Sequence, residues 1–185
     1  IDKTGFMSIS LAAVLVHEAG HFIAMRILKI KPREISLSLR GVLIVSPGVP
    51  TDVGRLIVAG AGPAANIITG VLSFALGFNT VGYVHFIVAV YNLLMIKGLD
   101  GGEIVSALMN ICGYGEKRWI PLIVSYVSIG FLITAGTSIL LFYGNVSLIL
   151  LGIYLLFLTF IFSPPNHINL FALLLAFLIT ALLLL

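Results

Sequence analysis

Long apolar runs constrain this chain more than any other feature. Only a helix satisfies its own backbone polar groups in lipid, and about 20 residues of helix cross the hydrocarbon core. The chain is 60% hydrophobic and 9% charged over 185 residues, which leaves no room for a soluble domain of ordinary size. We therefore expect an all-α polytopic membrane protein, organised as one membrane-embedded domain over residues 1–185 with about six transmembrane helices. The expected spans are Phe6 to Leu28, Leu56 to Phe78, Val81 to Ile96, Ile120 to Phe142, Val146 to Phe162 and Ile168 to Leu185.

Basic residues mark alternate connectors between these spans. Lysine and arginine occupy residues 29–55 and 97–118, whereas the connectors around Asn79 and Gly144 contain neither. By the positive-inside rule, the two basic connectors face the cytoplasm, and the first span runs from outside to inside. This predicts a multi-pass integral membrane protein. The basic residues are scattered rather than clustered, so a nucleic-acid partner is not expected.

The first connector has a strand-like pattern. In "REISLSLRGVLIVSPG", apolar residues alternate with polar ones from Ile35 to Arg40, and Gly41 then interrupts the alternation. This favours a short membrane-associated β-hairpin after the first helix. A purely amphipathic connector is an equally open alternative.

The first span carries three ionisable residues in "VLVHEAGHFIAM". His17 and His21 are four residues apart, so on a helix both imidazoles project from one face, with Glu18 beside them. This H-E-x-x-H spacing is typical of zinc sites, where the glutamate can accept the proton of a water molecule. The alternative is a set of polar residues satisfied by interhelical hydrogen bonds. Ionisable residues inside a span are costly and by default functional, which favours the metal site.

A third ligand is expected from the few acidic residues of the chain. Asp100 follows the third span in "NLLMIKGLDGGEI", and that span should end near the level of the histidines. Asp100 is therefore the preferred ligand, although an aspartate could also cap a helix over Ile104 to Met109. Glu103 is interpreted as a first-turn charge that the helix dipole favours, and His85 as a side chain at the outer membrane interface.

Three segments together resemble the signatures of the site-2 protease family of intramembrane zinc metalloproteases. They are "HEAGH" in a span, "GAGPAANI" from Gly60 to Ile67 and "NLLMIKGLDGG" from Asn92 to Gly102. The resemblance covers about residues 11–109 and is closest to the minimal or sporulation-type prokaryotic branch. It implies a catalytic core over about residues 6–109, with additional helices over residues 119–185.

The resemblance also implies roles for individual residues. His17, His21 and Asp100 would bind Zn²⁺, and Glu18 would be the general base. Asn66 and Asn92 would orient the substrate or stabilise the oxyanion, or alternatively form interhelical hydrogen bonds.

The resemblance further implies regulated intramembrane proteolysis. The substrate would be a membrane-spanning anti-sigma factor, pro-sigma factor or transcription-factor precursor, cleaved toward the cytoplasmic side of the lipid bilayer.

One departure from the family pattern leaves two other functions open. The family commonly has prolines where this chain has Met95, Lys97 and Gly98, which predicts a less rigid loop before Asp100. A catalytically inactive relative that binds membrane partners is therefore one alternative. A metal-ion transporter is another, with His85 extending the pathway, although no second copy of the motifs appears.

Overall fold

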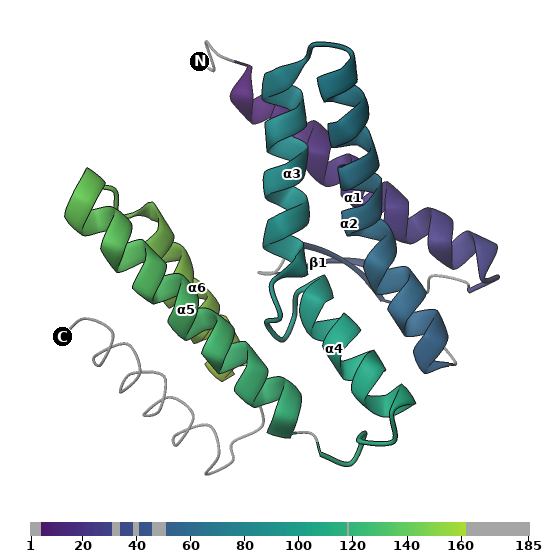
Figure 1. Cartoon of the computed structure of the whole chain (residues 1–185). Coiled ribbons are helices and arrows are strands. Elements are labelled where there is room, and N and C mark those ends of the chain that lie inside the picture. The colour runs from purple at the N-terminus through teal and green to yellow at the C-terminus, as the bar shows by residue number, and fades with distance from the viewer. Residues whose placement is uncertain (1–4, 31–33, 39–40, 46–50, 118, 162–185) are drawn as a thin grey trace. The chain divides into compact units, whose positions relative to one another are not determined.

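The computed structural model describes residues 5–30, 34–38, 41–45, 51–117 and 119–161 (Figure 1). The helices in these ranges are α1 (Phe6–Ile27), α2 (Asp52–Ala75), α3 (Asn79–Leu93), α4 (Asp100–Ile111), α5 (Trp119–Tyr143) and α6 (Ser147–Ile161). Five of them coincide with expected spans, and α4 is an additional short helix. The expected span from Ile168 to Leu185 lies outside the described residues.

Contacts between residues divide the chain into two compact units. The first unit contains residues 1–94 and 99–115, and the second contains residues 95–98 and 116–185. The boundary near residue 115 falls between the expected catalytic core and the expected additional helices. The organisation as one membrane domain stays a prediction.

Helix α2 is the central element of the first unit. It packs against α1, α3 and α4, and α1 crosses behind α2 and α3 in Figure 1. At the crossing of α1 and α2, a Cβ on Gly20 would lie 2.5 Å from the Ala61 carbonyl oxygen and 2.9 Å from Ala65 Cβ. Small residues therefore bring the two backbones together, as is common between helices in membranes.

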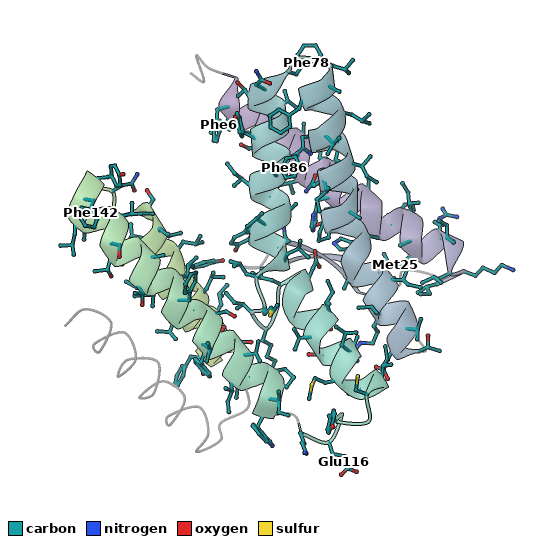
Figure 2. All side chains as sticks on the ribbon, in the orientation of Figure 1. Phe6, Met25, Phe78, Phe86, Glu116 and Phe142 are labelled. Atoms are coloured by element: carbon teal, nitrogen blue, oxygen red, sulfur yellow. The ribbon has the colours of Figure 1, made fainter. Side chains whose placement is uncertain are left out.

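Three of the described helices are long and apolar enough to cross a membrane: α1, α2 and α5. Large apolar side chains are exposed on the helices, among them Leu15 and Ile23 of α1, which are 61% and 57% exposed. Phe6 and Phe142, which are labelled in Figure 2, are further exposed examples. A hydrocarbon environment removes the cost of such exposure, because lipid tails are as apolar as these side chains. The protein is accordingly a membrane protein.

A two-stranded sheet follows α1. Strands β1 (Glu34–Ser38) and β2 (Gly41–Val45) pair antiparallel, with Glu34 opposite Val45 and Ser38 opposite Gly41. These strands occupy the segment in which the sequence predicts a hairpin, and the two residues between them lie outside the described ranges. Association of this sheet with the membrane stays a prediction.

The second unit is built on the pairing of α5 with α6. A Cβ on Gly136 would lie 2.8 Å from the Ile149 amide nitrogen, so the two backbones approach closely. In the same unit the Lys97 amide N–H donates a hydrogen bond of 2.9 Å to Ser125 Oγ, a buried side chain. A proline at position 97 has no N–H and could not make this bond. Lys97 thus gives the loop a specific attachment that a proline at this position would lack.

The crossing of α1 and α2 predicts opposite effects for two glycine-to-alanine changes. Gly20→Ala should lower the apparent melting temperature of the protein in detergent, because the added methyl overpacks the crossing at a cost of about 1–3 kcal/mol. Gly60→Ala is the matched control, since a Cβ there meets nothing within 4 Å. The control should leave stability unchanged or raise it by up to about 1 kcal/mol through helix propensity. Equal melting temperatures for the two variants would contradict this packing.

Candidate metal centre

Helix α1 presents two histidines from one face. His17 is buried and His21 is partly buried, and their Nε2 atoms are 3.1 Å apart. The rings meet edge to face, with centroids 4.7 Å apart. The spacing of four residues therefore aims two imidazole nitrogens at one point, as the sequence predicts.

Asp100 reaches the same point from α4. It is the first residue of that helix, one position past the N-cap residue Leu99, and its carboxylate faces the histidines instead of capping the helix. Asp100 Oδ2 lies 2.9 Å from His17 Nε2 and 3.3 Å from His21 Nε2. Burial acts to raise the pKa of Asp100, but the two imidazoles outweigh it and hold the pKa below its ordinary value.

The three atoms form a triangle of the size that a metal ion requires. With ligands at about 2.0–2.1 Å, two ligand atoms of a tetrahedral ion lie about 3.3 Å apart. The observed separations of 2.9, 3.1 and 3.3 Å are close to this value. Asp100 Oδ2 is buried, and it faces the Nε2 atoms of His17 and His21. Because two imidazole nitrogens and a carboxylate oxygen are all metal-ligand atoms, a cation shared by the three atoms fits the arrangement. His17, His21 and Asp100 could therefore hold a metal ion.

Gly62 of α2 forms one wall of this site. A Cβ at Gly62 would overlap His21 Nε2 and would lie 2.8 Å from His17 Nε2. Any side chain at this position would occupy the space in which the nitrogens converge. The sequence marks Gly60 to Ile67 only as one of three segments of a family resemblance, and the direct contact of Gly62 with the imidazoles becomes clear from the structure.

The other ring nitrogens are held by α2 and α3. His21 Nδ1 lies 2.8 Å from the Val58 carbonyl oxygen, to which it can only donate. This bond places the proton on Nδ1 and leaves Nε2 free to bind a metal, the usual outer contact of a metal-binding histidine. His17 Nδ1 lies 3.2 Å from Asn66 Nδ2, and Asn66 Oδ1 lies 2.8 Å from His85 Nδ1.

His85 and the Val58 carbonyl are the site contacts that the sequence does not identify. His85 is 3% exposed and packs inside the helix bundle next to Asn66. It is therefore not the interfacial side chain that its place in the third span suggests. The occurrence of a histidine in an apolar helix is the sequence signal that could identify His85 as part of the site. The Val58 carbonyl has no such signal, because every residue has a backbone carbonyl.

The remaining predicted residues take different positions. Glu18 is half-buried and directly follows His17 on α1. Asn92 donates through Nδ2 to the Val88 carbonyl of its own helix at 3.0 Å. Among the described residues, hydrogen bonds thus join Asn66, and not Asn92, to the histidines.

Polar contacts attach α4 to the start of α2. Arg55 pairs with Asp52 at 3.1 Å and with Glu103 at 3.0 Å, and Asn110 Nδ2 donates to Asp52 Oδ1 at 2.8 Å. Glu103 lies in the first turn of α4, as expected. These groups are substantially exposed, so each ion pair contributes at most about 1 kcal/mol. These contacts connect α4, the helix that carries Asp100, to the start of α2.

The fold and the cluster define a helical membrane protein with a candidate metal site between its helices. Comparison with solved structures identifies a match to the Site-2 Protease from Methanocaldococcus jannaschii, with a TM-score of 0.62 and 22% sequence identity. The match covers 86% of this chain and 77% of the other. The chain therefore has the site-2 protease fold. No protein-family model and no curated protein matches the sequence.

Gly62→Ala should weaken metal binding without unfolding the protein. The added methyl displaces the imidazoles at a cost of about 1–3 kcal/mol, which corresponds to a loss of affinity of about five- to 150-fold. Competition with a chromogenic chelator measures the affinity, and Gly60→Ala is the control on the same helix. Unchanged affinity in Gly62→Ala would show that this wall does not face the metal.

Proposed function

We propose that this protein is an intramembrane zinc metalloprotease, which hydrolyses a peptide bond in or near a transmembrane segment of a membrane-tethered regulatory protein. The observation that carries the proposal is the convergence of His17, His21 and Asp100, with Glu18 beside them, on helices of a membrane protein. The site-2 protease fold supports it.

The donor set favours zinc over calcium and magnesium. Two imidazoles and one carboxylate are typical of catalytic zinc sites, which keep a further position for water. Calcium and magnesium instead favour sites composed of oxygen ligands. The site therefore has the composition of a catalytic zinc centre.

Glu18 is proposed as the general base. Zinc bound at this site would acidify a water molecule and polarise the peptide carbonyl. Glu18 accepts the proton of the attacking water and returns it to the leaving amine nitrogen as the C–N bond breaks. Asn92 is half-buried near the end of α3, and we propose that it helps to orient the substrate.

The substrate and the topology follow from the same proposal. By the positive-inside rule, the basic residues after α1 favour a cytoplasmic C-terminal end for this helix, and a site on the cytoplasmic side of a multi-pass protein is proposed on that ground. The substrate is a membrane-spanning anti-sigma factor, pro-sigma factor or transcription-factor precursor. Strands β1 and β2 could pair with an unwound substrate segment as an added strand.

Two single substitutions separate metal binding from proton transfer. Glu18→Gln should retain one zinc ion per chain and lose cleavage of a membrane-spanning test substrate by about 100-fold or more, because it cannot accept a proton. Asp100→Asn should lose zinc, because a neutral amide is a poorer ligand than a carboxylate. Zinc is measured by elemental analysis of purified protein and cleavage by gel electrophoresis.

Glu103→Gln is the matched control for the loss of a carboxylate. Its side chain pairs with Arg55 rather than with the histidines, so both zinc content and cleavage should persist. Zinc binding without cleavage of any test substrate by the wild type would instead support an inactive relative. A wild type that binds no zinc would contradict the proposal.

A further inference from the structure

Asn66 and His85 form a buried polar pair behind the proposed metal site. Asn66 is fully buried and His85 is 3% exposed, and they come from α2 and α3. The pair continues from His17 as a chain of hydrogen bonds of 3.2 and 2.8 Å. Buried polar groups are costly unless each finds a partner, so the chain restricts where every proton in it can lie.

We propose that Asn66 and His85 are positioning residues that set the tautomer of His17 for metal binding. The inference rests on the proposed zinc site and adds residues to it. His17 can offer the Nε2 lone pair only when its proton is on Nδ1. That N–H then needs an acceptor, and the amide of Asn66 is the group beside Nδ1, with its nitrogen 3.2 Å away.

The asparagine amide connects the tautomers of the two histidines. The Asn66 oxygen must face His17 Nδ1 in order to accept a hydrogen bond from its N–H. In the structure, the amide nitrogen of Asn66 faces His17 Nδ1 instead. A half-turn of the amide exchanges the two atoms and directs the Nδ2 donor to His85 Nδ1. His85 must then present a lone pair at Nδ1 and carry its proton on Nε2. Zinc at His17 is therefore linked to one tautomer of His85.

His21 does not need such a pair. The Val58 carbonyl is an acceptor that cannot turn into a donor, so His21 has its tautomer set by the backbone. The two ligands of α1 thus differ in how they are oriented. His17 should be the one that depends on buried side chains.

The first test measures zinc affinity of the full chain in detergent by chelator competition. Asn66→Leu and His85→Leu should each lose about 10- to 100-fold, the usual effect of removing an outer partner of a ligand. Asn66→Asp and His85→Gln should stay within about threefold of the wild type, because each keeps an acceptor for its neighbour. Ser73→Ala is the control, since Ser73 is another buried polar residue of α2.

The second test reads the tautomers directly by ¹⁵N NMR of histidine-labelled, zinc-loaded protein. The wild type should show His85 protonated at Nε2. In Asn66→Asp, whose carboxylate only accepts, His85 should be protonated at Nδ1 while zinc is retained. A purely structural role for Asn66 would leave the His85 tautomer unchanged between the two proteins. This comparison remains decisive if a leucine variant fails to fold.

The outcomes separate this inference from the proposed function. Zinc binding in the wild type with equal affinity in both leucine variants would overturn the inference and leave the metalloprotease standing. Loss of zinc in Ser73→Ala as well would assign the effects to general packing and overturn the inference too. A wild type without zinc would overturn both.

Discussion

The close approach of α1 and α2 is the constraint on which the site depends. Gly20 meets the backbone of α2 at Ala61, and one residue further along α2 the bare backbone of Gly62 lies against the imidazoles of His17 and His21. A larger residue at either position would separate the helices or fill the point of convergence. Asp100 can complete the triangle only because Gly101 lets α4 begin in contact with the Leu93 and Leu94 carbonyls. Three glycines therefore determine whether three ligands meet.

The two sides of the triangle differ in what stabilises them. On one side, a backbone group acts directly, because the Val58 carbonyl holds His21, while side-chain contacts of Arg55 and Asp52 attach α4 to α2. On the other side, His17 depends on the amide of Asn66. An amide can present either a donor or an acceptor, whereas a carbonyl cannot. The hydrogen bonding of the site is thus fixed at His21 and adjustable at His17.

Much of this arrangement could be predicted from the sequence, because it depends on local spacing. The four-residue separation of His17 and His21 is sufficient for a shared helix face, and the apolar runs agree with five helices within a few residues. The sequence predicts the level of Asp100 only from the antiparallel course of the spans, and it offers the short helix that carries Asp100 only as an alternative. It also predicts His85 at the membrane interface, whereas His85 is buried beside Asn66 of another helix. Contacts made by backbone atoms, such as Val58 O, leave no trace in residue identity.

X-ray absorption at the zinc edge of the purified, zinc-loaded protein tests the central claim most directly, because it reports the ligands of the metal without a substrate. The arrangement predicts only nitrogen and oxygen ligands at about 2.0–2.2 Å, with the multiple-scattering pattern of two imidazoles. A sulfur ligand at about 2.3 Å would assign the metal to Cys112, the one cysteine of the chain, and would contradict the site. An all-oxygen shell without imidazole scattering would contradict it equally.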